Sequence, residues 1–152
     1  MMLKKGDIAP DFSSQDQNGK QVILSALKGK KVVVYFYPKD DTPGCTKEAC
    51  NLRDNHSLLL EKGFVVIGIS PDNDKSHAKF AEKFSLPFSL IPDPELTIIK
   101  AFGAWGKKSM YGKEYEGLLR TTFIINEEGV IDEVIQKVKT DDHSNQILKI
   151  YT

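Results

Sequence analysis

The chain has 152 residues, 40% of them hydrophobic and 28% charged, which is typical of a globular domain with one core. Its 21 basic and 21 acidic side chains balance, so no strong overall field attracts nucleic acid or an acidic membrane surface. Apolar runs fall short of the ~20 residues that a membrane-spanning helix needs, and the N-terminus lacks the apolar region of a secretory signal. We therefore expect one cytoplasmic domain over residues 1–152.

The first half of the chain predicts a β-hairpin followed by a strand, a helix and a second strand. Asn18-Gly19 is a strong turn signal, so residues 11–24 are expected to form the hairpin, with a short helical turn after Ser25. Residues 31–37 are apolar on both faces, which favours a central strand. Thr42-Pro43 suits the start of a helix and Gly63 its end, and residues 64–70 form the next buried strand. This β-α-β unit predicts a parallel strand pair.

The second half predicts further helices and an antiparallel pair of strands. In chain order we expect a helix from Pro71–Asp74 onward, a short strand at 86–91, a helix at 95–102, a loop or weak hairpin at 103–117, a hairpin of 119–126 with 130–138, and a terminal helix at 141–151. The order predicts an α/β fold: a central mixed sheet flanked by helices, with an N-terminal β-hairpin. A β-α-β half followed by a β-β-α half is the thioredoxin-like arrangement.

Both cysteines, Cys45 and Cys50, lie where the central strand is followed by the helix. A close pair in a reducing compartment indicates catalysis or metal binding rather than a structural disulfide. Cys45 falls in the first helical turn, whose free N–H groups are expected to lower its pKa and favour the thiolate. Asp40 and Asp41 would oppose this effect if they pointed inward, so we expect both to face solvent. The alternative is that Cys45 is only a small buried residue of a well-capped helix.

The spacing of the two cysteines restricts how they can bond. Five residues of ideal helix separate Cα atoms by about 8.7 Å, whereas a disulfide needs them within ~7 Å. Either the pair never bonds, or bonding is coupled to local unfolding of the helix.

The histidines do not form a recognisable metal or catalytic motif. A structural zinc site needs four ligands, and the two cysteines have no second paired motif beside them, so we expect no metal. His56 is expected to be a packed or boundary residue of the helix, and His77 and His143 are expected on the surface. The sequence contains no Ser-His-Asp arrangement or phosphate-binding loop signature.

The pattern Pro38-x-x-x-Thr42-x-x-Cys45 resembles the active-site motif of the peroxiredoxins. The second cysteine five residues later is similar to the bacterioferritin comigratory protein (PrxQ) subfamily. The resemblance extends over nearly the whole chain, through Ala9-Pro10-Asp11-Phe12, residues 105–112 and residues 120–123.

This resemblance implies a thiol-dependent peroxidase that reduces hydrogen peroxide and organic hydroperoxides. Cys45 would be the nucleophile that becomes a sulfenic acid. Cys50 would resolve it as an intrachain disulfide, which thioredoxin or a similar dithiol protein would reduce. The resemblance implies no cofactor, neither metal, haem nor flavin, and favours a monomer that binds neither nucleic acid nor membrane.

The resemblance also assigns roles around the thiol. Pro38 would shield Cys45, and the Thr42 hydroxyl would bond peroxide and thiolate. The amides of Gly44 and Cys45 would bind the peroxide oxygens. Arg120 would supply the cation that stabilises the thiolate and the leaving oxygen, and Glu48 would orient that arginine. From the residues alone, Arg120 and Glu48 would be a strand-end arginine and an exposed helix residue.

Two other functions fit a thioredoxin-like fold. One is a thiol–disulfide oxidoreductase of thioredoxin type, although the C-x-x-C spacing is absent. The other is a non-enzymatic binding module whose cysteines do not react with peroxide.

Overall fold

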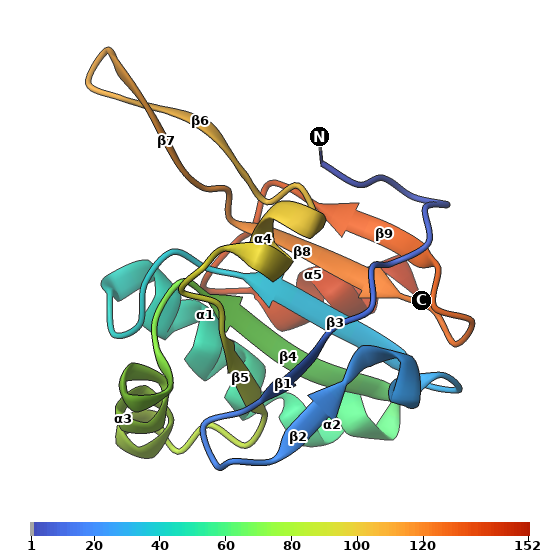
Figure 1. The fold of residues 1–152 in the computed structure, drawn as a ribbon. Helices are drawn as coiled ribbons and strands as arrows, with labels where there is room; N and C mark the ends of the chain where they lie inside the picture. Colours follow the sequence, from blue (N-terminus) through green and yellow to red (C-terminus); the bar gives the residue numbers. More distant parts are fainter. Residues whose placement is uncertain (1) are drawn as a thin grey trace.

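A five-stranded mixed sheet with the order β5-β4-β3-β8-β9 forms the centre of the computed structural model, which describes residues 2–152 (Figure 1). Met1, the first residue of the predicted domain, lies outside that range. The strands of the sheet are β3 (Lys31–Phe36), β4 (Phe64–Ser70), β5 (Ser89–Pro92), β8 (Thr121–Ile125) and β9 (Ile131–Ile135). β3, β4 and β5 are parallel, whereas β8 is antiparallel to both β3 and β9. The predicted parallel pair, the C-terminal hairpin and the mixed sheet are confirmed.

Successive side chains of β3 point to opposite faces of the sheet, and both faces are buried. One face packs against α1 (Pro43–Asp54), α2 (His56–Glu61), α3 (Asp74–Phe84) and α5 (His143–Ile150). The other packs against α4 (Thr97–Ala101) and residues of the N-terminal segment. The central position predicted for this strand follows from its apolar residues on both faces. No described helix is both long enough and apolar enough to cross a membrane.

Two small hairpins lie outside the main sheet. The N-terminal one, predicted from Asn18-Gly19, pairs β1 (Ser13–Gln15) with β2 (Gln21–Ile23) and leads into a 3₁₀ turn, Leu24–Leu27. The other pairs β6 (Trp105–Met110) with β7 (Lys113–Leu118) and projects away from the body of the protein (Figure 1). The sequence predicted a loop or weak hairpin there, and the structure has a regular one.

The helix expected to run continuously from Pro43 to Gly63 is broken at Asn55, which separates α1 from α2. Three donors share the Asn51 carbonyl: the Asn55 amide at 3.3 Å, the Asn55 side chain at 2.9 Å and the Ser144 hydroxyl at 3.1 Å. Side-chain donors of this kind compete with the helical hydrogen bond. The break also changes the helical phase, so Leu59 is buried but Leu60 is exposed.

Candidate active site

The site begins in residues 38–42, a loop that follows Tyr37, the residue directly after β3, and leads into α1. Thr42 is the extended residue before the helix, as predicted, and Pro43 occupies the first helical position. The Thr42 hydroxyl does not cap the helix: it donates to the Lys39 carbonyl at 2.8 Å, because the turn brings that carbonyl beside it. Among residues 2–152, the amides of Gly44 and Cys45 have no protein acceptor. Two N–H donors are therefore available at the start of a twelve-residue helix.

Cys45 is the buried thiol at the start of α1, with 1% of its surface exposed. It packs with the apolar residues of α1 against the sheet. The Nη2 of Arg120 donates to its sulfur at 3.1 Å. The sheet register explains this contact: Phe36, the last residue of β3, pairs with Thr121, so Arg120 lies where the chain leaves β3. Two residues far apart in sequence thus meet through strand pairing. Pro38, in the same loop, is half-buried.

Glu48 lies one turn after Cys45 and is completely buried. Its Oε1 accepts a hydrogen bond from Arg120 Nη1 at 2.5 Å. Burial raises the pKa of Glu48 to about 7, although the charge of Arg120 acts in the opposite direction. Burial lowers the pKa of Arg120, but the nearby Glu48 and Cys45 outweigh that effect and raise it overall, so the guanidinium is always charged. One cation therefore connects the thiol and the carboxylate.

His143, predicted on the surface, is completely buried beside Glu48, so that prediction is wrong. Its Nδ1 faces the Gln146 Oε1 at 2.8 Å and its Nε2 faces the Thr122 hydroxyl at 2.7 Å. Burial lowers the pKa of His143 and favours the neutral ring. The Glu48 Oε2 lies 3.6 Å from Nε2 and has no hydrogen-bond partner within residues 2–152. The spacing of His143 and the buried Ile147, four residues apart on one helix face, is the signal that indicates burial.

Cys50 is half-buried, and both cysteines are free. They lie five residues apart in the intact α1, so ideal helix geometry separates their Cα atoms by about 8.7 Å. Directly after Cys50, Asn51 connects α1 to the start of α5. Its side chain donates to the Asp141 carbonyl at 3.1 Å and accepts from the Ser144 amide at 2.7 Å. A disulfide between the two cysteines therefore requires the turns before Asn51 to unwind.

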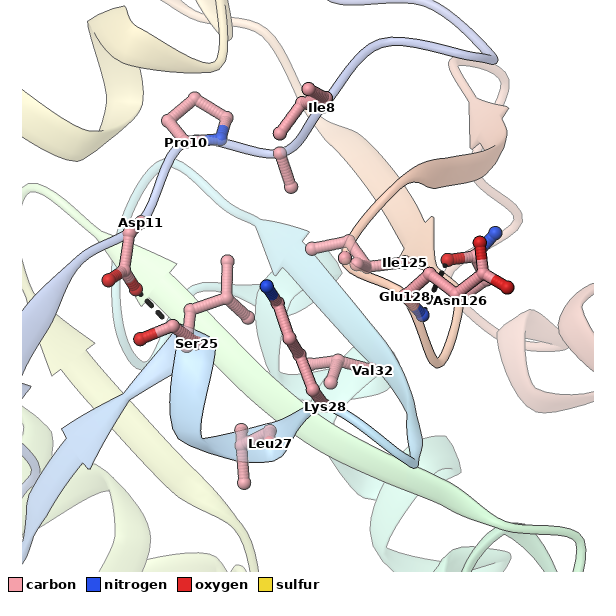
Figure 2. A pocket seen from close by; sticks show the side chains of 13 residues that line it. Ile8, Pro10, Asp11, Ser25, Leu27, Lys28, Val32, Ile125, Asn126 and Glu128 are labelled. Carbon is pink, nitrogen blue, oxygen red and sulfur yellow. Dashed lines mark hydrogen bonds between the residues drawn. The ribbon is translucent and has the colours of Figure 1, made fainter.

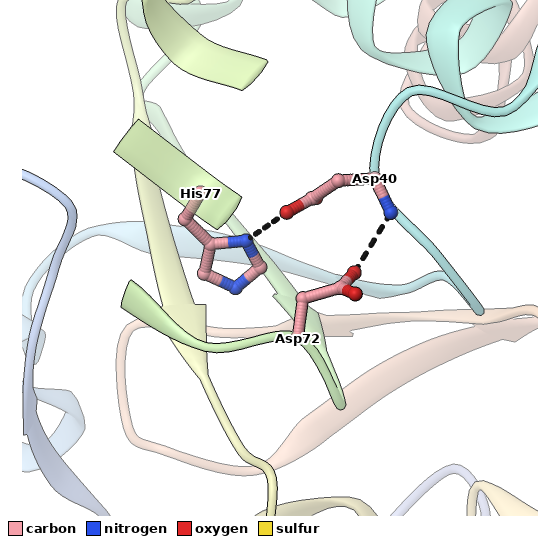
Figure 3. A group of neighbouring side chains, drawn as sticks. All are labelled: Asp40, Asp72 and His77. Carbon is pink, nitrogen blue, oxygen red and sulfur yellow. Dashed lines mark hydrogen bonds and ion pairs between the residues drawn. The ribbon is translucent and has the colours of Figure 1, made fainter. Parts of the chain in front are cut away.

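Asp40 was expected to face solvent and is instead buried, with its carboxylate turned towards His77 (Figure 3). His77, also predicted on the surface, is completely buried, so both predictions are wrong. Asp41 is exposed as expected and pairs with Lys83. The position of His77 three residues before the buried Phe80 is a helical signal for burial that the surface prediction missed. His56 is half-buried against the Phe88 ring, which confirms it as a boundary residue.

A cavity of about 480 Å³ lies at the opposite end of β3, beside Val32 (Figure 2). It is lined by residues of the N-terminal segment, the 3₁₀ turn and the β8–β9 turn. Asp11 at its rim accepts from the Ser25 amide at 2.9 Å. Neither cysteine nor Arg120 lines this cavity, so it is separate from the thiol site.

Comparisons with known proteins identify the family. The family model described as AhpC/TSA matches residues 5–134. The chain is 49% identical over 148 residues to a putative peroxiredoxin Bcp from Coxiella burnetii, covering 97% of this chain and 98% of that protein. It is 46% identical over 149 residues to peroxiredoxin Bcp of Bacillus subtilis, covering 98% and 95% of the two chains.

Solved structures of similar proteins support the same family assignment. Peroxidoxin BcpB of Mycobacterium tuberculosis superposes with a TM-score of 0.84 at 37% identity, covering 97% of this chain and 95% of that one. A mutant of PrxQ from Xylella fastidiosa gives a TM-score of 0.91 at 28% identity, covering 99% and 96%. The chain therefore belongs to the AhpC/TSA family and, within it, to the Bcp/PrxQ peroxiredoxins, which are thiol-dependent peroxidases.

Proposed function

We propose that peroxide reduction takes place at Cys45 and that Arg120 is its principal electrostatic partner. The observation that supports this assignment most directly is the single guanidinium that donates to both the Cys45 sulfur and the Glu48 carboxylate. A fixed cation stabilises a thiolate and also the negative charge that develops on a departing oxygen. Because Glu48 holds the other side of the guanidinium, the donor is oriented before a peroxide arrives.

The proposed reaction forms one sulfur–oxygen bond and breaks one oxygen–oxygen bond. The Cys45 thiolate attacks the terminal oxygen of a hydroperoxide and becomes a sulfenic acid. The other oxygen leaves as hydroxide or alkoxide and takes up one proton to become water or alcohol. We assign the unpaired amides of Gly44 and Cys45 to binding the peroxide oxygens.

Thr42 and Pro38 complete the proposed site. The Thr42 hydroxyl gives its proton to the Lys39 carbonyl, so its oxygen is left to accept the O–H of the hydroperoxide. Pro38, half-buried in the same loop, would limit the access of water to the thiol.

Cys50 is the proposed resolving residue. Its thiol condenses with the Cys45 sulfenic acid, a disulfide forms, and one water leaves. A dithiol protein of thioredoxin type then exchanges with the disulfide, becomes oxidised itself and returns both cysteines to thiols. This cycle needs no metal or organic cofactor, acts in a reducing compartment such as the cytoplasm, and is complete within one monomer.

The proposal is tested by intact mass after one equivalent of hydrogen peroxide. Wild type is expected to lose two hydrogens, Cys50→Ser to gain one oxygen, and Cys45→Ser to do neither promptly. Undiminished peroxide consumption by Cys45→Ser would refute the assignment. A thioredoxin-type oxidoreductase would instead reduce protein disulfides rapidly without any peroxide, which the same variants can report.

A further inference from the structure

Asp40 is a buried carboxylate between two exposed residues of the 38–42 loop, Lys39 and Asp41. Its carboxylate accepts from the Tyr37 hydroxyl at 2.6 Å and the Ser76 hydroxyl at 2.8 Å, and lies 2.7 Å from His77 Nδ1 (Figure 3). A buried carboxylate is costly without such partners. These contacts join the loop to the end of β3 and to α3.

The backbone of the same loop residue is also held. The Asp40 amide donates to the Asp72 Oδ2 at 2.7 Å (Figure 3). The Ser70 hydroxyl donates to the same oxygen at 2.7 Å. The loop is thereby attached to the end of β4, the strand next to β3. Asp40 thus connects residues 38–42 to three neighbouring elements by both its side chain and its backbone.

The partners of His77 determine how many protons the pair holds. Its Nε2 lies 3.1 Å from the Ile91 carbonyl, which can only accept, so Nε2 carries a proton. Its Nδ1 faces Asp40 Oδ2, so one further proton lies between these two atoms, on the ring or on the carboxyl. In either form the pair has no net charge, which suits its burial.

The same side chains do not form a convincing cation site. The carboxylates of Asp40 and Asp72 and the His77 ring bring ligand atoms within 4.8 Å of one another. However, each of those atoms already has a hydrogen-bond partner among the described residues. A cation would have to displace protons that the network accounts for.

We propose that the Asp40–His77 pair is a positioning device for the loop that carries Pro38 and Thr42, and that it sets how fast Cys45 reacts with peroxide. The inference rests on the proposed function of that loop. Asp40 lies two residues from Pro38 and two from Thr42. If the loop is released at Asp40, both of these residues move. A misplacement of about 1 Å in a reacting site can cost roughly a hundredfold in rate. The pair lies outside α1, so it can hold the loop while the helix unwinds and rewinds.

Two substitutions at Asp40 separate contacts from charge. In Asp40→Asn, the amide oxygen accepts from Tyr37, and the amide nitrogen donates to Nδ1 of a neutral His77 ring, so the network is kept. Asp40→Ala removes every side-chain contact. Asp41→Asn is the matched control, because it removes a charge from the exposed neighbouring residue, and asparagine tolerates its left-handed φ of 57°.

The experiment compares two reactions of Cys45 in a Cys50→Ser background. One is oxidation to the sulfenic acid by hydrogen peroxide, followed by mass, and the other is alkylation by iodoacetamide, which needs a thiolate but no peroxide geometry. We expect Asp40→Ala to slow oxidation at least fivefold, with alkylation changed less than threefold. Asp40→Asn and Asp41→Asn are expected to stay within threefold of the parent in both reactions.

A smaller drop in Asp40→Ala, or an equal drop in oxidation and alkylation, overturns the positioning role. If Asp40→Ala does not fold, Tyr37→Phe removes one donor to Asp40 with little change of shape. Slower oxidation with unchanged alkylation in that variant supports the proposal, and unchanged oxidation overturns it. A parent protein that gains no oxygen from peroxide would instead contradict the proposed function, so the two failures are distinguishable.

Discussion

The guanidinium of Arg120 donates to the sulfur of Cys45 at 3.1 Å, although 75 positions separate the two residues in the chain. Its other terminal nitrogen is held by Glu48, so the geometry needs a planar fork with two donors. An ammonium group cannot hold both partners in the same directions.

Arg120→Lys is therefore expected to slow the oxidation of Cys45 by peroxide about 10²- to 10³-fold, the usual cost of losing a transition-state donor. Single-turnover oxidation, followed by mass, measures this rate. Arg53→Lys is the control, because Arg53 pairs with the exposed Asp54 on the far end of α1. Equal rates for Arg120→Lys and wild type would contradict the role given to Arg120.

Glu48 should make the stability of the protein depend on pH. Its pKa is about 7 in the folded protein, against 4.5 for an ordinary glutamate, so the folded state keeps a proton that the unfolded state has lost between these values. The contribution of Glu48 to the free energy of unfolding is thus expected to fall as pH rises from about 4.5 to 7, by up to about 3 kcal/mol.

Denaturant unfolding of wild type and Glu48→Gln at several pH values between 4.5 and 8 measures the contribution of Glu48 to the free energy of unfolding. The wild-type stability should fall relative to Glu48→Gln across the window. Glu61→Gln, at an exposed position of α2, should follow the wild-type curve. Parallel curves for wild type and Glu48→Gln would contradict the prediction.

Oxidation should open the first turns of α1 and leave its neighbours folded. Because an intact helix keeps the two cysteines apart, amides of residues 46–50 are expected to lose protection from hydrogen exchange in the disulfide form. Residues 56–61 of α2 and 64–70 of β4 should keep theirs. Peroxide-treated Cys50→Ser is the control, and unchanged protection of residues 45–52 in the disulfide form would refute the prediction.

Gly68 should tolerate no side chain, because β4 packs tightly there. An added Cβ would lie 2.8 Å from Tyr35 Cζ and 2.9 Å from Leu90 Cδ2. We expect Gly68→Ala to lower the free energy of unfolding by about 1–3 kcal/mol through overpacking. In Gly106→Ala, the added Cβ would lie 3.2 Å from the flexible end of the Leu119 side chain. This substitution should therefore lower the free energy of unfolding by less. Denaturant unfolding of both variants checks the order.

Local patterns were sufficient to predict most of the fold. The apolar residues on both faces of 31–37 indicated the centre of the sheet, and Asn18-Gly19 indicated the first hairpin. The break at Asn55 was missed because one of the donors that share the Asn51 carbonyl is Ser144, a partner from another helix that no local pattern reveals. The regular β6–β7 hairpin was seen only as a weak possibility, since its strands are mostly polar and charged.

The thiol and its partners Arg120 and Glu48 were predicted through a motif and a family resemblance, whereas three other buried polar residues were not. Asp40, His77 and His143 are polar residues that sequence reasoning assigns to the surface, and each is buried because a distant element supplies its hydrogen bonds. Helical spacing to Phe80 and Ile147 indicates burial of the two histidines, but it does not identify their partners. Those depend on how the helices pack on the sheet.

The attachment of Asn51 to α5 has a consequence for the lifetime of the sulfenic acid. Only the turns before Asn51 need to unwind in the proposed cycle, and the remainder of the helix stays joined to α5. A short opening is completed sooner than the unfolding of a whole helix, so Cys50 reaches the oxidised sulfur earlier. In the proposed cycle, this anchor therefore shortens the interval in which a second peroxide can convert Cys45 irreversibly to a sulfinic acid.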